Sequence, residues 1–251
     1  METPKLLRRS CKGNKRYLLP FGDVHIGAPG CNLKKAKDYI QWAIDNDAWI
    51  LGMGDLIENA SRHSVGNGVN EQTLRNDEQI DAAIELLKPV AKKGLLLGLL
   101  HGNHEWRADK EVDINPTKYI ARVLGVPFLG YTIFLYLRVG KITYTVYALH
   151  GASSSTKPAG KVGALFDLSR GVNADLYLMG HVHDLFTGAD VVRYVDMASK
   201  TAKEKKRYYA LTGSYLEYFD GYGEMKGYTM VKLGSPRVRL DGTKFDLHLS
   251  I

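Results

Sequence analysis

Apolar runs and helical repeats alternate along the first half of the chain, which predicts strands and helices in turn. The segments 16–22, 49–53 and 95–100 are short and mainly apolar, as buried strands are. Residues 33–46 and 74–93 carry apolar side chains at helical spacing. Because such strand–helix–strand alternation implies right-handed crossovers, we expect a mostly parallel sheet.

The second half of the chain has a strand-rich pattern. Gly140-Lys141 separates two strand-like segments, 134–139 and 142–149, as the turn of a tight hairpin does. A helix is expected at 161–170. The later β-rich segments are 186–197, 207–213, 228–233 and 236–249. We therefore expect a second, largely antiparallel sheet packed on the first, with helices on the outer faces.

No linker or repeat divides the chain. Its 251 residues, 45% apolar and 24% charged, suffice for one globular domain with a full core. We expect this domain to span residues 16–251, behind a basic N-terminal segment at 1–15. No window holds the roughly 18 apolar residues of a membrane span, and no secretory signal is recognisable. The two cysteines favour a reducing, cytoplasmic location.

The net charge of +7 is concentrated in two segments. Residues 1–16 hold six Lys or Arg against one acidic residue, and residues 199–207 hold five against one. Local excesses of this kind suit a polyanionic partner such as nucleic acid. A solubilising tail and a solvated loop would give the same pattern, so charge alone leaves both interpretations open.

Five polar segments, each following a short apolar run, hold five of the eight histidines of the chain. They are Asp23-Val24-His25, Gly54-Asp55 with Glu58, Gly102-Asn103-His104-Glu105, His150-Gly151, and Gly180-His181-Val182-His183. An open α/β sheet places its active site at strand ends, so we expect these segments to meet there.

The spacing within two of these segments suits metal binding. At the end of an extended strand, residues two apart point the same way. By that argument Asp23 with His25, and His181 with His183, can each reach one ion.

The remaining donors complete a ligand set of oxygen and nitrogen atoms. Asp55 offers two oxygens and could bridge two ions, Asn103 supplies a carbonyl oxygen, and His150 adds an imidazole. With no thiolate present, the set suits Mn, Fe, Zn or Ni. Two such ions about 3.5–4 Å apart can activate water and polarise a phosphoryl oxygen.

In these five segments the chain resembles the calcineurin-like metallophosphoesterase superfamily. The family pattern is D-x-H, G-D-x-x-[DE], G-N-H-[DE], H-G and G-H-x-H, and all five blocks occur in order between residues 23 and 183. They span about two-thirds of the chain, and the C-terminal third carries no diagnostic motif. The resemblance implies the family's four-layer α/β/β/α sandwich of two mixed sheets, with the metal site at strand ends.

The resemblance also implies a role for each matched residue. Asp55 would bridge two metals, each held by three further ligands: Asp23, His25 and His183 for one, and Asn103, His150 and His181 for the other. His104 would face the scissile phosphate and protonate the leaving oxygen. Glu58 and Glu105 would orient the ligand imidazoles.

Departures from the family pattern favour one branch. Residues 54–59, Gly-Asp-Leu-Ile-Glu-Asn, lack the Asp-Arg-Gly extension of the protein Ser/Thr phosphatases. Residues 23–27, Asp-Val-His-Ile-Gly, are closer to the nucleases and general phosphodiesterases.

Six residues near the motifs are candidates for substrate contact: Arg62, His63, Trp106, Arg107, Lys157 and Lys161. Trp106 with Arg107 would suit base stacking and phosphate contact, although this pair could equally cap the core. The other four lie in polar segments that solvent alone would explain.

The sequence thus predicts a cytoplasmic phosphoester hydrolase with two divalent metal ions, manganese being the expected metal. The expected reaction is attack of a metal-bridging hydroxide on a phosphodiester, with DNA or RNA as the favoured substrate. A phosphomonoesterase or small-nucleotide phosphodiesterase is the alternative enzyme, and a non-catalytic binding scaffold is the alternative without catalysis. No membrane partner is expected, and a homo-oligomer is neither indicated nor excluded.

Overall fold

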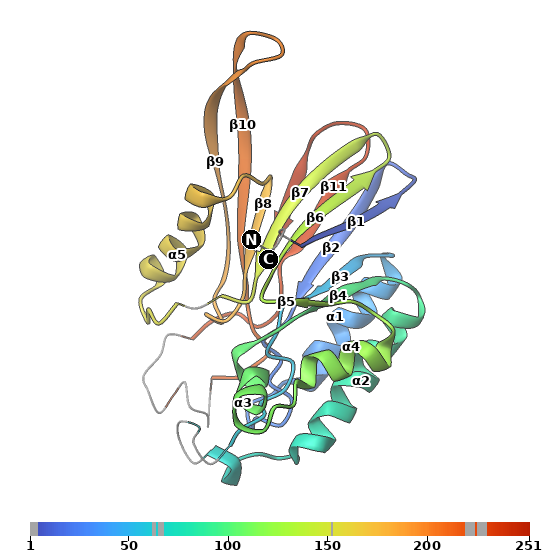
Figure 1. Ribbon diagram of the computed structural model, residues 1–251, viewed down its shortest axis with the longest axis vertical. Coiled ribbons are helices and arrows are strands. Elements are labelled where there is room, and N and C mark those ends of the chain that lie inside the picture. Colours follow the sequence, from blue (N-terminus) through green and yellow to red (C-terminus); the bar gives the residue numbers. More distant parts are fainter. Residues whose placement is uncertain (1–4, 62–63, 65–67, 152, 219–223, 225–229) are drawn as a thin grey trace.

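Two mixed sheets lie face to face between two layers of helices (Figure 1). The computed structural model describes residues 5–61, 64, 68–151, 153–218, 224 and 230–251. Within these residues it contains two six-stranded sheets and five α-helices. The architecture is the four-layer α/β/β/α sandwich that the resemblance implied, so this prediction of the fold class is confirmed.

The first sheet has the strand order β12-β11-β2-β3-β4-β5. Its strands are β2 (Lys15–Phe21), β3 (Trp49–Gly52), β4 (Leu96–Leu100), β5 (Phe128–Gly130), β11 (Arg237–Asp241) and β12 (Leu247–Ser250). Strands β2 to β5 are parallel, as predicted, whereas β11 and β12 add an antiparallel edge. The carboxyl ends of β2, β3 and β4 therefore lie at one edge of this sheet.

The second sheet has the order β1-β6-β7-β8-β10-β9. Its strands are β1 (Leu6–Cys11), β6 (Thr132–Val139), β7 (Ile142–Leu149), β8 (Leu176–Met179), β9 (Leu185–Asp196) and β10 (Thr201–Thr212). The prediction that this sheet is largely antiparallel was wrong, because β1–β6, β7–β8 and β8–β10 are parallel pairs. The physical reason is the helical crossover after β7, which returns the chain so that β8 runs parallel to β7.

Helices cover the outer face of each sheet (Figure 1). They are α1 (Leu33–Asp45), α2 (Asn76–Lys92), α3 (Asn103–Val112), α4 (Pro116–Leu124) and α5 (Pro158–Gly171). Side chains of α1, α2 and α4 pack on the first sheet, and α5 packs on the second. None of the helices in the described part of the chain has the length and apolar character of a membrane span.

Three apolar cores correspond to the three interfaces between the four layers. Neighbouring residues of β2 point in opposite directions, as in any strand. Leu18 therefore packs between the sheets, and Leu19 packs under the helices. Leu165, Tyr177 and Tyr209 belong to the third core, under α5. Both faces of the central strands are thus buried, which explains their nearly continuous apolar sequence.

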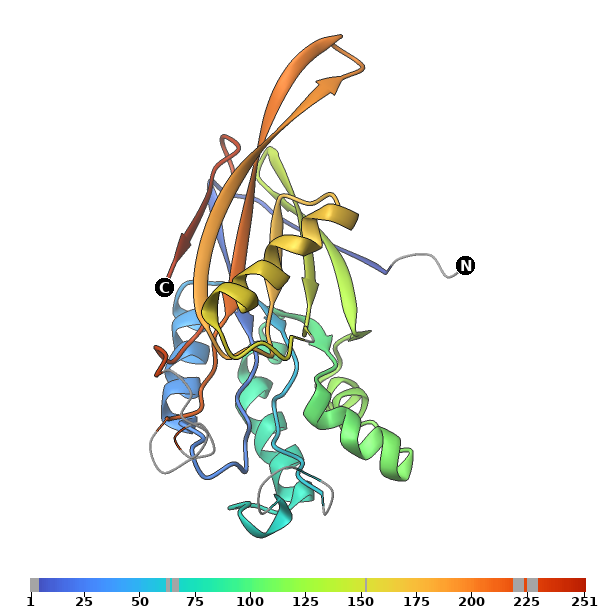
Figure 2. The same cartoon turned by 90° about the vertical axis from the view of Figure 1, so that its left-hand side faces the viewer.

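The two basic segments are structured differently from a tail and a loop. Residues 6–11, within the N-terminal segment 1–15, form an edge strand paired with β6. Most of the segment 199–207 lies in β10, which forms a long hairpin with β9 that extends beyond the rest of the sheet (Figure 2). The described part of the predicted strand 228–233, residues 230–233, forms no strand.

Candidate metal centre

The five motif segments meet where strands of both sheets end. From the first sheet, β2 leads to Asp23 and His25, β3 to Asp55, and β4 to Asn103 and His104; from the second, β7 leads to His150, and β8 to His181 and His183. Six of the eight side chains come from turns that follow directly on buried strands, and Asn103 and His104 begin helix α3 just after β4. The rigid strands therefore fix the position of each functional group at this end of the sandwich.

Five of these residues have a left-handed backbone conformation that non-glycine residues rarely adopt. The φ angles are 49° at Asp23, 53° at His25, 49° at Asp55, 69° at His181 and 59° at His183. Sharp turns, rather than a continued extended strand, therefore aim these side chains. Such conformations cost free energy and concentrate at functional sites, where the surrounding structure enforces them.

One group of candidate ligands consists of Asp23, His25 and His183. Their donor atoms lie within 4.8 Å of one another. His25 Nε2 is 3.1 Å from His183 Nε2, which is 3.5 Å from Asp23 Oδ1. Both nitrogens and the carboxylate thus face one small volume, as ligands of a single ion do.

A second group consists of Asp55, His150 and His181. Asn103 joins it, because its Oδ1 is 2.9 Å from His150 Nε2 and 2.7 Å from His181 Nδ1. Asp55 Oδ2 lies 3.2 Å from His150 Nε2 and 3.9 Å from His25 Nε2. The Asp55 carboxylate therefore lies between the two groups.

The prediction from residue spacing was wrong for the motif that contains His181 and His183. The two-residue spacing predicted that His181 and His183 reach the same ion, but the structure assigns them to different groups. Both residues have a positive φ, so the parallel orientation of an extended strand does not apply. The argument holds only for Asp23 and His25, which do share a group.

Hydrogen bonds fix the orientation of two imidazoles toward these groups. His25 Nδ1 donates to Glu58 Oε2 at 3.0 Å, and His150 Nδ1 donates to the carbonyl oxygen of Met53 at 2.8 Å. In each ring the proton on Nδ1 leaves Nε2 facing the candidate ligands. Partners of this kind set the tautomer of metal-binding histidines.

The ionisation of the acidic groups fits a site built for cations. Burial raises the pKa of Asp23 to about 8. Burial and the neighbouring Asp55 raise the pKa of Glu105 to about 7. Burial disfavours the charged form of His150, but Asp55 outweighs it and raises the pKa to about 10. The raised pKa values mean that this buried site favours bound protons, which offset the negative charge of its carboxylates. Divalent cations would supply the same positive charge.

The other candidate imidazoles are held in the neutral form that binds metals. Burial lowers the pKa of His25, His181 and His183 below the ordinary value for histidine. Together with two carboxylates and an amide oxygen, they provide only nitrogen and oxygen donors. The residues present therefore suit the binding of divalent metal.

Glu58 holds two imidazoles of the site. Besides His25, it contacts His104, whose Nδ1 lies 2.9 Å from the Glu58 carbonyl oxygen and 3.3 Å from Oε2. Although burial opposes ionisation, the hydrogen bonds from His104 and His25 hold the pKa of Glu58 below its ordinary value. Glu58 therefore stays ionised, and its contacts hold the His25 and His104 rings in place.

Glu105 binds the backbone of the turn at residues 55–57 and contacts none of the ligand imidazoles through a hydrogen bond given by the described residues. Its carboxylate accepts from the backbone N–H groups of Asp55 at 3.0 Å, Leu56 at 2.7 Å and Ile57 at 3.3 Å. The resemblance implied that it orients a ligand imidazole, but its contacts fix the turn that carries Asp55. Glu105 thus acts on the site through the backbone.

His104 lies at the N-terminus of α3, beside the candidate ligands. Its backbone N–H donates to Asp55 Oδ1 at 2.9 Å, and its Nε2 is 3.1 Å from Arg107 Nη2. Burial opposes the charged imidazole, but Asp55 and the hydrogen bond with Glu58 outweigh it and raise its pKa. Because a guanidinium only donates, His104 Nε2 accepts from Arg107 Nη2 in this geometry, and the raised pKa favours uptake of a proton by His104 once this contact opens.

Two buried polar residues that the motifs did not single out support this arrangement. Asn59 Nδ2 donates to the carbonyl oxygen of His104 at 2.8 Å, and its own backbone N–H donates to Gln79 Oε1 at 2.8 Å. The signal for Gln79 was available in the sequence, because it is a polar residue on the buried face of α2, four residues before Ala83.

The candidate substrate-contacting residues are placed unevenly. Arg62 and His63 lie outside the described residues. Trp106 is 45% exposed with Lys110 Nζ 5.7 Å from its ring centre, and Lys157 is exposed at the start of α5. Arg107 and Lys161 line a cleft of about 910 Å³ that is also lined by His25, Asp55, His104, His181 and His183. Of the six candidates, the structure brings Arg107 and Lys161 to the site.

Gly102 gives a test of how closely the site is packed. A Cβ atom there would lie 2.1 Å from Asp55 Oδ1 and 2.4 Å from Glu105 Oε2. Gly102→Ala is expected to destabilise the fold by about 1–3 kcal/mol, as overpacking does, and to reduce metal binding. Chemical denaturation and metal analysis measure both effects. The control is Gly163→Ala on α5, where no atom lies within 4 Å; equal behaviour of the two variants would contradict the prediction.

No family model matches this chain, and no curated protein matches it either. Several solved structures are similar to it in fold. A predicted phosphoesterase from Streptococcus pneumoniae TIGR4 is 15% identical with a TM-score of 0.41, and a metallophosphoesterase from Sphaerobacter thermophilus is 14% identical with a TM-score of 0.38. Each alignment covers 94% of this chain and 88% of the other. A double mutant of Vps29 from Entamoeba histolytica is 14% identical, with a TM-score of 0.35 and coverage of 80% and 99%.

Proposed function

We propose that this protein is a metal-dependent phosphoester hydrolase of the calcineurin-like metallophosphoesterase superfamily. The observation that carries the proposal is the convergence of five motifs, separate in the sequence, on one cluster of donor atoms, which four of the motifs expose to a single cleft. There, two groups of oxygen and nitrogen donors flank Asp55, with His104 beside them. A buried histidine is common in proteins, but this combination in this order is typical of the superfamily.

We propose a dinuclear centre, with Asp23, His25 and His183 holding one ion, Asn103, His150 and His181 holding the other, and Asp55 between them. Manganese is the proposed metal. Two divalent ions held there would polarise a phosphoryl oxygen and lower the pKa of water at neutral pH.

The residues of the chain itself would bind the phosphate and move the proton. His104 Nδ1 carries a hydrogen that the carbonyl oxygen of Glu58 accepts, so Nε2 is the atom available for proton transfer. Arg107 Nη2 lies 3.1 Å from this Nε2. A phosphate oxygen placed beside both groups would replace their mutual contact and, with His104 protonated, accept from both. Arg107 would thus orient the phosphate while His104 protonates the leaving oxygen.

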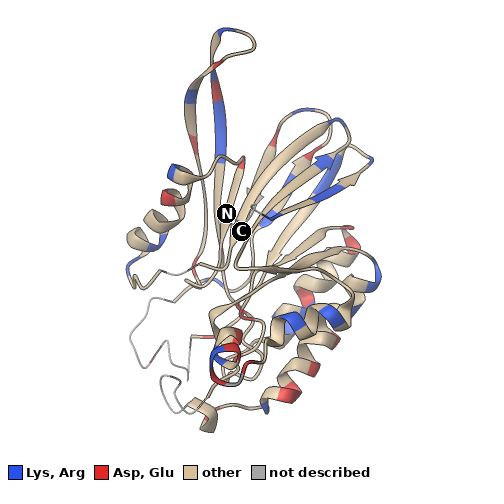
Figure 3. Cartoon of the chain, in the orientation of Figure 1, with Lys and Arg blue, Asp and Glu red and all other residues tan. Residues whose placement is uncertain are grey.

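We propose a phosphodiester as the substrate, with nucleic acid as the favoured class. Support comes from the form of the first motif and from β1, where Arg8 and Arg9 are exposed. Support from the basic hairpin is weaker, because acidic partners accompany its cations (Figure 3). The ion pairs join Lys203 to Asp196, Lys205 to Asp175, and Arg207 to Asp190.

The same ion pairs favour a second candidate, a small-nucleotide phosphodiesterase. Such an enzyme needs no long cationic groove, because its substrate carries one or two phosphates. Among the described residues that line the cleft, acidic side chains such as Glu58, Glu71 and Asp184 outnumber the Lys and Arg residues, Arg107 and Lys161. A cleft of this composition suits a short ester better than a long polyanion.

An activity screen tests the proposed function. Metal-free protein reconstituted with manganese is assayed on bis-p-nitrophenyl phosphate, p-nitrophenyl phosphate, and labelled single- and double-stranded DNA and RNA. Cleavage of the diester supports the proposal, and polynucleotide cleavage supports the nucleic-acid substrate. Cleavage of the monoester alone would make the protein a phosphatase, whereas metal binding without any cleavage would favour a scaffold.

Salt dependence tests the role of β1. If the cations of β1 and of the turn after it contact nucleic acid, replacing Arg8 in β1 and Lys12 just after it by Ala lowers the slope of log affinity against log salt by about one to two. Fluorescence anisotropy with single-stranded DNA measures this slope. The matched control replaces Lys34 and Lys37, two exposed lysines of α1, by Ala. Equal slopes in both variants, or binding that is insensitive to salt, would contradict a specific contact.

We also propose a cytoplasmic location, supported by Cys11 and Cys31, which are free thiols in the structure. Unpaired cysteines are typical of a reducing compartment.

A further inference from the structure

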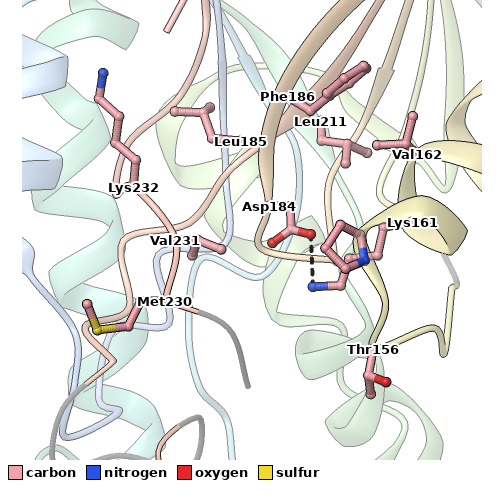
Figure 4. Close-up of a pocket in the computed structure, with 11 residues that line it drawn as sticks. Thr156, Lys161, Val162, Asp184, Leu185, Phe186, Leu211, Met230, Val231 and Lys232 are labelled. Atoms are coloured by element: carbon pink, nitrogen blue, oxygen red, sulfur yellow. Dashed lines mark ion pairs between the residues drawn. The ribbon is translucent and has the colours of Figure 1, made fainter. Parts of the chain in front are cut away.

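A smaller pocket adjoins the cleft that holds the candidate metal ligands. It has a volume of about 300 Å³ and lies between α5, the start of β9 and residues 230–232 (Figure 4). Most of its lining is apolar: Pro158, Val162, Leu185, Phe186, Leu211, Met230 and Val231. The role of this pocket is not explained by metal binding or by proton transfer, because no candidate ligand lines it.

The pocket and the cleft share a wall. Thr156, Lys161, Asp184 and Val231 line both. Lys161 Nζ lies 3.1 Å from Asp184 Oδ2, and Figure 4 shows this ion pair between the two sides of the pocket. Asp184 directly follows His183 in the chain. The pocket is therefore directly adjacent to the part of the cleft next to His183.

We propose that the pocket binds the base of a nucleotide ester whose phosphate occupies the cleft. This inference rests on the proposed function, and it names the part of the substrate that the enzyme selects. The ester is either the terminal nucleotide of a nucleic acid or a free nucleotide ester, since both present the same base and phosphate.

The chemistry of the pocket suits a base. Its volume lies at the lower limit for small-molecule sites, so it accommodates one ring system rather than a long chain. Phe186 offers an aromatic surface, and the aliphatic side chains provide apolar contact with the faces of a flat ring. Lys161 and Asp184 offer a donor and an acceptor, which match the polar edge of a base. Because they are paired, these two residues add little net charge to the wall.

The test compares two diesters with the same leaving group. Thymidine 5′-(p-nitrophenyl phosphate) carries a base, whereas methyl p-nitrophenyl phosphate does not. Val162→Trp fills the pocket from α5, at a partly buried position. It is expected to lower kcat/KM for the thymidine ester about 5- to 150-fold, the range expected for the loss of one stacked base. For the methyl ester, kcat/KM should change less than about twofold.

Arg170→Trp is the matched control, because its side chain is 82% exposed on the same helix. It should leave both substrates unaffected. An equal loss on both substrates in Val162→Trp would overturn the inference, as would a wild-type enzyme that does not prefer the thymidine ester. Circular dichroism on both variants shows whether the fold is retained, and Met230→Trp, at a residue that lines the pocket but not the cleft, repeats the test from another segment.

A binding measurement separates failure of this inference from failure of the proposed function. Saturation-transfer NMR with thymidine alone needs neither turnover nor metal. Thymidine binding that is lost in Val162→Trp but kept in Arg170→Trp supports the pocket even if no ester is hydrolysed. Absence of thymidine binding to the wild-type protein overturns it, even if bis-p-nitrophenyl phosphate is cleaved.

A labelled oligonucleotide distinguishes the two sources of the base. If the substrate is a chain end, Val162→Trp slows release of terminal nucleotides to the same degree as hydrolysis of the thymidine ester. If the substrate is a free nucleotide ester, the wild-type enzyme hydrolyses the thymidine ester and leaves the oligonucleotide intact. Either result names the source of the base, whose place in the pocket the Val162→Trp comparison tests.

Discussion

Replacing His104 by Ala is expected to lower kcat on a labelled dinucleotide, whose alkoxide leaving group must be protonated, about 10²- to 10⁴-fold, the usual contribution of general acid catalysis. The ring is held by Glu58 and lies beside Arg107, so its Nε2 is positioned for transfer of one proton. It is not one of the proposed metal ligands. Metal content, measured by inductively coupled plasma mass spectrometry, should therefore remain that of the wild-type protein.

The distinctive result is loss of turnover with metals retained. His248→Ala, at an exposed position of β12, is the matched control and should keep both activity and metal. If His104→Ala keeps its activity, the residue has no part in proton transfer. If it loses metal as well as activity, His104 is a ligand, which its position with His25 and Asp55 in a third group of donors would permit.

Replacing Asp55 by Ala is expected to remove both of the proposed metal ions. The measured quantity is the number of metal ions bound per chain. Its carboxylate lies between the two groups, 3.2 Å from His150 Nε2 and 3.9 Å from His25 Nε2. The loss of a shared ligand weakens both sites, and activity should fall to background. Metal analysis after gel filtration measures the stoichiometry.

Asp38→Ala, which removes an exposed carboxylate from α1, controls for the change in charge and should bind metal normally. Two metals per chain in Asp55→Ala would rule out a bridging role. Loss of one metal only would assign Asp55 to a single site. Asp55 Oδ1 also accepts the backbone N–H of His104, so the thermal stability of the metal-free variant should be compared as well.

The sequence by itself determined the chemical content of the site and the class of fold. Apolar runs too short for helices predicted β2, β3 and β4, and helical spacing predicted α1 and α2. These signals are local, because a buried strand or an amphipathic helix records its burial in its own residues. The five motifs also follow directly on strands, so their meeting at strand ends could be expected from a parallel sheet.

Local patterns were insufficient where neighbours in space decide the structure. Helix α3 has a polar sequence, and what holds its first turn is the contact of Glu105 with the backbone of the Asp55 turn. Strand β1 is basic and mostly exposed, and pairing with β6 makes it a strand. Parallel pairing of β8 with β7 and β10 likewise depends on which strands become neighbours, which no alternation within one strand records.

Only the tertiary structure decided how the ligands divide and what surrounds them. His181 and His183 are two residues apart, yet left-handed turns direct them to different groups. Asp184 and Lys161 come together from separate elements and form the wall between the cleft and the apolar pocket. The sequence therefore determined which atoms are available for metal and phosphate chemistry. Their distances, and the shape of the substrate they can accept, arise from packing between segments far apart in the chain.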